Sequence, residues 1–293
     1  MLRISRRRLL LGAAGAAAVG VLPTTPVFAA PRALTRDALG SILAGHRLVT
    51  YYGNPLSGAM GILGQLSKSD LVAAIQGRAA QYQAAGGKST LGAVHMVVTV
   101  AQGSPGDDGL WRARMPASLI GEYADLAAAN GLLFVADVQV GKSTVQDELA
   151  PLMQFLNRPN VHLALDPEFD MWGGQQPGVE IGHMTAAEIN YAQNLLSNLA
   201  SATGQQKILM IHQFAGLMLP DKGNIGTAPG VDLAIVMDGW GGQGIKIQHY
   251  DMFVRDSDIR FGGIKLFFDQ DPDLMTASQA LSLTPKPDVI IYQ

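Results

Sequence analysis

Three acidic residues stand at alternate positions after an apolar run, and this is where the sequence most strongly indicates chemistry. The run is Val161 to Leu165, and the acids are Asp166, Glu168 and Asp170. Successive side chains of a strand point to opposite faces, so the three carboxyl groups are expected on one face. Pro167 has no N–H to donate, so regular pairing is expected to stop near it. Carboxylates crowded at the end of a buried strand cost electrostatic energy, which is typical of a functional site.

Hydrogen-bonding or titratable groups also occur near the ends of the other apolar runs. If these runs are parallel strands of a barrel, their carboxyl ends meet at one mouth. Packing alone does not explain so many polar endings, because lone buried charges are costly. The candidates for catalysis are Glu168, Asp166 and Asp238, and the candidates for substrate binding are Tyr52, Asp137, Gln139, His212, Gln213, Trp240, Lys265, Asp269 and Tyr292.

These residue types favour one class of reaction. The sequence has no cysteine, which excludes thiolate nucleophiles, disulfides and cysteine metal sites. It has no G-x-S-x-G elbow, no P-loop, and no G-x-G-x-x-G after the first expected strand. Carboxyl groups among amides, tyrosines and tryptophans suit the cleavage of a glycosidic bond. In that reaction one carboxylic acid protonates the leaving oxygen, and a carboxylate stabilises the positive centre or activates water.

The segment Asp166-Pro167-Glu168, at the end of the fourth expected strand, resembles the D-x-E element of barrel glycoside hydrolases. The families concerned are the lysozyme-type muramidases and the chitinases. The resemblance implies that Glu168 is the general acid and that Asp166 orients it or assists the substrate. It also implies that Asp238, on the sixth strand, lies where muramidases keep another carboxylate.

The sequence departs from both family patterns outside this element. The fuller chitinase pattern is D-x-x-D-x-D-x-E, and here Val161 and Ala164 stand at its other aspartate positions. The first-strand aspartate of muramidases is replaced by Tyr51-Tyr52-Gly53. The resemblance therefore predicts a glycoside-hydrolase-like barrel acting on a polysaccharide or cell-envelope glycan, with no family assigned.

Two other functions fit the same residues. A metal-dependent hydrolase could hold a cation at the barrel mouth through Asp137, Asp166, Glu168, His212 and Asp238. No H-x-H or H-E-x-x-H spacing supports that alternative. A non-catalytic barrel could bind glycan, although sugar binding needs no crowded carboxylates.

Individual candidates also have simpler structural explanations. Asp166 could only cap the segment that follows it or pair with Lys265 across the mouth, and His212 could be a hydrogen-bonded residue inside the barrel. Asp269 lies in a polar run that could be a solvated turn.

Eight apolar runs are expected to be strands, with helical patterns between most of them. Both faces are apolar, as in Leu132 to Ala136, which favours parallel strands covered by helices. Residues 31–293 are therefore predicted to form one α/β domain, a (β/α)8 TIM barrel whose eighth outer helix is missing. A helix-like piece from Arg36 to Leu43 is expected to cover the bottom of the barrel or that gap. An open doubly wound sheet is the alternative.

The sequence pattern places these elements as follows. The expected strands are His46 to Gly53, Ala93 to Val100, Leu132 to Val140, Val161 to Phe169, Lys207 to Phe214, Val231 to Trp240, Gly263 to Asp269 and Asp288 to Gln293. The expected helices are one beginning at Asp70, then Ala117 to Ala129, Thr144 to Leu156, Thr185 to Leu199, Ile247 to Val254 and Ala277 to Leu283.

Residues 1–30 are expected to be a signal peptide of the twin-arginine type. Arg6, Arg7 and Arg8 precede an apolar stretch, and Val27 to Ala30 offers small residues for cleavage. An ordinary secretory signal is the alternative. The apolar stretch, about 14 residues, is shorter than the ~20 that a membrane span needs. An exported protein without a stable membrane anchor after cleavage is therefore expected, extracellular, associated with the cell wall or periplasmic.

The charge balance limits the partners. The formal net charge is −3, and the first thirty residues hold four arginines and no acid, so the remainder carries −7. An acidic chain without a basic run is not expected to bind nucleic acid or anionic lipid. A carbohydrate is the expected partner, no cofactor is expected, and the sequence carries no signal for an oligomeric state.

Overall fold

The computed structural model describes residues 40–293, and their strands form a closed parallel barrel. Each barrel strand pairs in parallel with the next, and β9 pairs back onto β1. The predicted TIM barrel is confirmed, and the open sheet is wrong because β1 has a neighbour on both sides. The eight barrel strands are β1 (His46–Gly53), β2 (Ser89–Ala101), β4 (Leu133–Val138), β5 (Val161–Leu165), β6 (Lys207–Gln213), β7 (Val231–Met237), β8 (Phe261–Leu266) and β9 (Val289–Tyr292).

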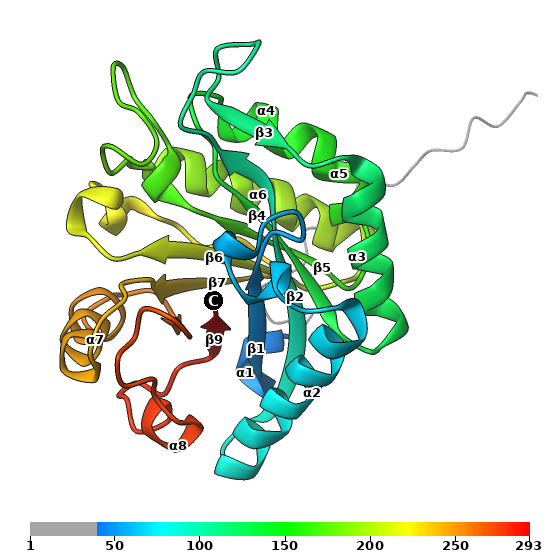
Figure 1. Ribbon diagram of the computed structural model, residues 1–293, viewed down its shortest axis with the longest axis vertical. Helices are drawn as coiled ribbons and strands as arrows, with labels where there is room; N and C mark the ends of the chain where they lie inside the picture. The colour runs from blue at the N-terminus through cyan, green and yellow to red at the C-terminus, as the bar shows by residue number, and fades with distance from the viewer. Residues whose placement is uncertain (1–39) are drawn as a thin grey trace, which may run out of the picture. The chain divides into compact units, whose positions relative to one another are not determined.

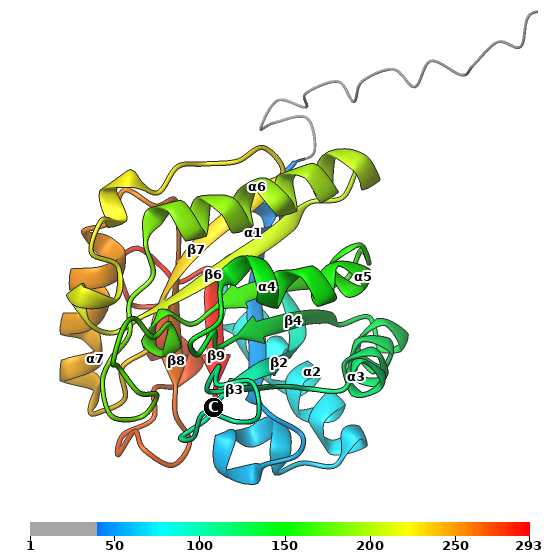
Figure 2. The same cartoon turned by 90° about the horizontal axis from the view of Figure 1, so that it is seen from above.

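Helices cover the outside of the barrel. Figure 1 shows the strands at the centre, with α2 and α3 on the right and α7 on the left, and in Figure 2 α6 lies above the strands. A capping box begins α6, because the side chains of Thr185 and Glu188 each accept from the other's backbone N–H. The helices are α2 (Lys68–Ala85), α3 (Ala117–Ala129), α4 (Val145–Leu149), α5 (Met153–Leu156), α6 (Ala186–Thr203), α7 (Gln243–Tyr250) with the π-helical turn η7 (Asp251–Arg255), and α8 (Ala277–Ala280).

Alternation along the strands produces two apolar layers. Outward side chains such as Ile211 and Ile290 pack beneath the helices. Inward side chains such as Val97 and Met210 fill the barrel. Because both sets are buried, the strands are apolar at nearly every position. Polar inward side chains near the carboxyl ends interrupt this pattern and lead to the candidate site.

Some connections differ from the repeating strand–helix unit. The short strand β3 (Arg112–Arg114), antiparallel to β2, was not predicted. Between β6 and β7 the chain forms only the 3-10 turns η5 (Gly216–Met218) and η6 (Lys222–Asn224), and a cleft of about 540 Å³ opens there on the outer face. The remaining 3-10 turns are η1 (Gly58–Met60), η2 (Ile62–Gly64), η3 (Ala150–Leu152) and η4 (Pro167–Phe169).

A short helix, α1 (Ile42–Gly45), closes the barrel at the amino-terminal end of its strands. Leu43 is fully buried among the inward side chains, and its N–H donates to Asp232 at 2.9 Å. The described part of the predicted helix Arg36 to Leu43 thus covers the bottom of the barrel. Residues 36–39 and the predicted signal peptide, 1–30, lie outside the described residues. Among residues 40–293, no helix has the length and apolar character that a membrane span requires.

Candidate active site

A cleft of about 560 Å³ lies where the barrel strands end. Loops after the strands converge at this end of a barrel, which is where barrel enzymes place their sites. Asp137 and His212 lie next to the cleft, fully buried inside the barrel. The lining brings together the predicted residues Tyr52, Gln139, Asp166, Glu168, Asp238, Trp240 and Lys265.

The Asp-Pro-Glu segment leaves its strand at once. β5 ends at Leu165, and the next residues form the 3-10 turn η4, in which Pro167 has no N–H to donate. Asp166 caps this turn by accepting from the Glu168 N–H at 3.2 Å. Asp166 and Glu168 both reach the cleft, but Asp170 does not line it. The prediction that all three acids share a strand face is therefore wrong, because strand alternation ends where the chain turns.

Glu168 is held in its protonated form at neutral pH. Burial, and then the charges of Asp166 and Asp238, raise the pKa of Glu168 to about 8. Burial also raises the pKa of Asp166 to about 6, against the opposing charge of His212. A carboxylic acid that is still protonated near pH 7 can donate a proton to a leaving oxygen.

Asp238 is held in the opposite state. Burial would raise its pKa, but the positive charges of Lys265 and His212 hold the pKa of Asp238 below its ordinary value. Lys265 Nζ donates to Oδ2 at 3.2 Å, and His212 Nδ1 lies 3.0 Å from the same oxygen. The expected alternative pairing of Lys265 with Asp166 is absent, since Lys265 pairs with Asp238. One cleft thus holds a protonated and an ionised carboxyl group.

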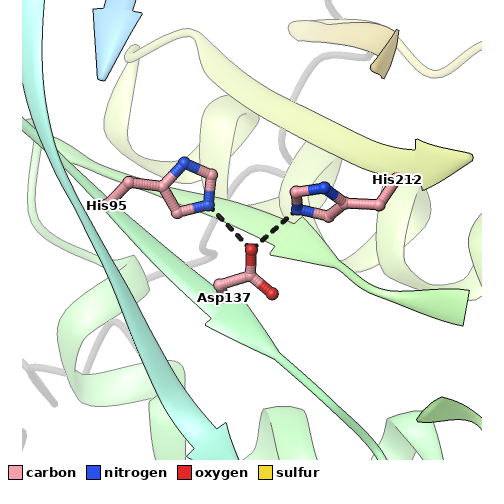
Figure 3. Close-up of side chains that lie close together, drawn as sticks. All are labelled: His95, Asp137 and His212. Carbon is pink, nitrogen blue, oxygen red and sulfur yellow. Dashed lines mark hydrogen bonds and ion pairs between the residues drawn. The ribbon is translucent and has the colours of Figure 1, made fainter. Parts of the chain in front are cut away.

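A buried network inside the barrel supports this arrangement (Figure 3). Asp137 Oδ2 lies 2.8 Å from His95 Nε2 and 2.8 Å from His212 Nε2, so it joins β4 to β2 and β6. Thr50 Oγ1 lies 3.2 Å from the other ring nitrogen of His95. The hydrogen-bonded role for His212 is therefore confirmed, and its contact with Asp238 links the network to the cleft.

The two histidines of this network differ in charge. Burial lowers the pKa of His95, so its ring is neutral and donates to Asp137 through Nε2. Burial would do the same to His212, but the charges of Asp137 and Asp238 outweigh it and raise the pKa to about 10. The His212 imidazolium and neutral His95 hold the pKa of Asp137 well below its usual range, despite its burial. The buried centre is therefore an imidazolium between two carboxylates.

His95 did not emerge from the sequence analysis. It is the single titratable residue in the apolar run Ala93 to Val100, two positions from Ala93 and Val97. Those two neighbours point into the barrel, so strand alternation places His95 inside as well. A lone histidine at an inward position of a parallel strand is therefore the sequence pattern that could have identified His95 as a site residue.

The side chains in Figure 3 are also the group that could hold a metal ion in the described part of the chain, since one ligand atom from each lies within 4.8 Å of the others. Asp137 Oδ1 has no hydrogen-bond partner among residues 40–293, which favours a cation. The charges disfavour one, because Asp137 and Asp238 are already balanced by His212 and Lys265. A cation would have to displace the proton of His212, whose pKa is raised to about 10.

Three predicted site residues lie elsewhere. Gln213 follows His212 by one position, so it faces outward, where its Oε1 accepts from Lys222 Nζ at 2.8 Å. Tyr292 also faces outward, and its hydroxyl lies 2.9 Å from that of Tyr82 on α2. Asp269 is exposed on the loop after β8 and lines a separate cleft. The prediction that these three residues lie in the site is therefore wrong. Strand alternation turns Gln213 and Tyr292 outward, and Asp269 lies on a loop outside the cleft.

Replacing Tyr292 by Phe tests the corrected placement. The change removes one buried hydrogen bond and keeps the ring, so the free energy of unfolding should fall by about 1 kcal/mol. Catalytic activity per folded molecule should not change, because the hydroxyl lies outside the cleft. Chemical denaturation and a rate measurement check the two parts, and a stable but inactive variant would return Tyr292 to the site.

Comparison with known proteins assigns no family. No protein-family model matches the chain, and no curated protein matches it. The Group IV chitinase of Ostrinia furnacalis in complex with allosamidin is similar to it at 10% identity and a TM-score of 0.35, over 65% of this chain and 50% of the chitinase chain. The chain thus spans about half the length of that chitinase.

A hyperthermophilic endo-β-1,4-glucanase in complex with substrate is also similar. The match has 8% identity and a TM-score of 0.42, and it covers 86% of this chain and 89% of the glucanase chain. At such identities and scores, neither the family nor the activity of this chain follows from the two matches.

Proposed function

We propose that this protein is a glycoside hydrolase acting on a polysaccharide or cell-envelope glycan, with Glu168 as general acid. One observation carries the proposal: a single cleft is lined by Glu168, whose raised pKa keeps it protonated, and by Asp238, whose lowered pKa keeps it ionised. Carboxyl groups whose surroundings push their pKa values apart are typical of paired acid and base roles.

The chemistry follows from these two states. Glu168 donates its proton to the oxygen of the leaving sugar as the glycosidic C–O bond breaks. An ionised carboxylate then stabilises the positive anomeric centre, either by bonding to it or by activating the water that adds to it. Asp238 and Asp166 are the two candidates for this second role.

The rest of the cleft suits a sugar chain. Trp240 is 67% exposed at the lining of the cleft, where its face is available to stack on a ring. Gln139 brings an amide into the same lining. Tyr52 brings a phenol, and the centre of its ring lies 3.8 Å from Lys265 Nζ. Amides and hydroxyl groups hydrogen-bond sugar hydroxyls. Residues 1–30 are expected to be an export signal. We therefore propose that the glycan belongs to the cell envelope or its surroundings.

A screen of polysaccharides and envelope glycans tests the function. The purified protein is incubated with each glycan, and both binding and the release of new reducing ends are measured. Release of reducing ends supports a hydrolase. Tight binding without release would instead favour the non-catalytic glycan-binding barrel.

Elemental analysis of the same preparation tests the metal-dependent alternative. We expect no stoichiometric metal, because a cation would have to displace the proton of His212. A stoichiometric transition metal or zinc, lost together with activity on chelation, would replace the carboxylate mechanism by a metal-dependent one.

A further inference from the structure

Two carboxylates in the cleft could be the ionised partner of Glu168, and their surroundings differ. Asp166 is contacted by neutral donors, namely Gln139 Nε2 at 3.5 Å and the Glu168 N–H at 3.2 Å. Asp238 is contacted by two cations, Lys265 and His212, each with a closest approach of 3.0 Å. Because a cation stabilises a carboxylate more than a neutral donor does, these contacts favour Asp238 as the ionised group.

The cation on His212 is itself held in place from within the barrel. Its Nδ1 faces Asp238, and its Nε2 lies 2.8 Å from Asp137 Oδ2. Asp137 is held in turn by His95 at 2.8 Å, and Thr50 contacts the far side of the His95 ring at 3.2 Å. All four inner side chains are fully buried, so their partners, and not water, fix their orientation. The chain of contacts ends on the Asp238 carboxylate.

We infer that Asp238 is the ionised catalytic partner of Glu168, and that His95, Asp137 and His212 are positioning residues that fix its charge and orientation from inside the barrel. The role given to Asp238 rests on the proposed function, whereas the positioning chain rests on the contacts alone. Asp166 then serves to cap the turn that presents Glu168.

The series of contacts from His95 to Asp238 has a direct electrostatic consequence. In Asp137→Asn, His212 loses one of its two carboxylate partners and should release its proton at a lower pH. Above that pH, Asp238 keeps only Lys265 as a cationic partner. Asp137→Asn leaves in place the other titratable groups facing Asp238, which are Tyr52 on β1, Asp166 and Glu168 after β5, Lys265 on β8, and Lys246 and His249 on α7.

NMR of selectively labelled protein tests the positioning chain without a substrate. In the wild type, the ring nitrogens of His212 should report an imidazolium at pH 8, because its pKa is raised to about 10. The carboxyl carbon of Asp166 should titrate near pH 6, and that of Asp238 should stay ionised well below that pH. In Asp137→Asn, the His212 titration should move down by about one pH unit or more.

A matched control is available at the other end of the barrel. Asp232 is a buried inward aspartate that anchors α1, so Asp232→Asn makes the same change away from the cleft. It should leave the resonances of His212 and Asp238 where they are. A His212 ring that is neutral at pH 8 in the wild type, or that titrates unchanged in Asp137→Asn, overturns the positioning chain.

The pH dependence of glycan cleavage tests the role of Asp238. Activity is lost as pH falls through the pKa of a group that must be ionised, so a change in the pKa of Asp238 moves the acid limb in the same direction. At the acidic pH where Asp238 titrates, His212 is still protonated in Asp137→Asn, so the loss of the Asp137 charge should lower the pKa of Asp238. We expect the acid limb to move downward in Asp137→Asn and to stay in place in Asp232→Asn. If the wild type cleaves no glycan, the proposed function fails. The NMR result still shows whether His95, Asp137 and His212 act as positioning residues. If it cleaves glycan while Asp166 is the ionised group and Asp238 the protonated one, the inference fails and the function stands.

Discussion

Replacing Glu168 by Gln is expected to lower kcat for glycan cleavage by about 10²–10⁴-fold, the contribution typical of a general acid. The amide keeps the size of the side chain, but its N–H protons are not acidic enough to be transferred to the leaving oxygen. Glycan binding should persist, because Trp240, Gln139 and the other lining groups remain. Initial rates and glycan titrations with both proteins measure the two quantities.

The same substitution at Glu180 provides the control for Glu168. Glu180 is exposed on the loop that follows the Asp-Pro-Glu turn, so Glu180→Gln changes the charge nearby without touching the cleft. Its activity should equal that of the wild type. Full cleavage by a folded Glu168→Gln protein would remove Glu168 from the mechanism.

Replacing Asp137 by Ala is expected to destabilise the protein by about 3–5 kcal/mol, the usual cost of breaking a buried ion pair from one side. His95 and His212 both lose their Nε2 partner, and neither ring can reach water because both are fully buried. The exposed loop residue Asp269 gives the control, since Asp269→Ala should change stability by only about 0.5 kcal/mol or less. Urea denaturation at pH 7 measures both.

The pH dependence of this stability difference has a defined sign. The pKa of Asp137 is lowered in the folded state, so its contribution is present above its unfolded value, about 3.9, and is lost as pH falls through the folded pKa. The cost of Asp137→Ala should therefore shrink below about pH 4. A cost below about 1 kcal/mol at pH 7 would show that the buried network does not stabilise the fold.

Much of the fold could be predicted because parallel strands buried on both faces have a strong sequence signal. The run Leu132 to Ala136 is apolar at every position, and it lies almost wholly in β4. Asp137 and Gln139 were both predicted at the barrel mouth, and strand alternation brings both inward near the end of β4. Alternation works there because the side chains follow a strand that is still regular.

The errors arose where alternation ends or where its direction is hidden. The chain turns after Leu165, so parity said nothing about Asp170. In the last strand both faces are apolar, and the sequence gives no sign that Ile291 points inward and Tyr292 outward. That choice is set by how β9 pairs with β1 and β8, which is a property of the closed barrel. The contact of His95 with Asp137 depends on the same long-range pairing.

The pH dependence of kcat/KM for glycan cleavage by the wild type tests the central claim most directly, because this quantity reports the ionisation of the free enzyme. A general acid loses activity as pH rises through its pKa, and burial with neighbouring acids raises the pKa of Glu168 to about 8. We predict a plateau near neutral pH and an alkaline limb centred near pH 8, assigned to Glu168. Activity that stays constant from pH 7 to above pH 10 would contradict the assignment of Glu168 as the proton donor.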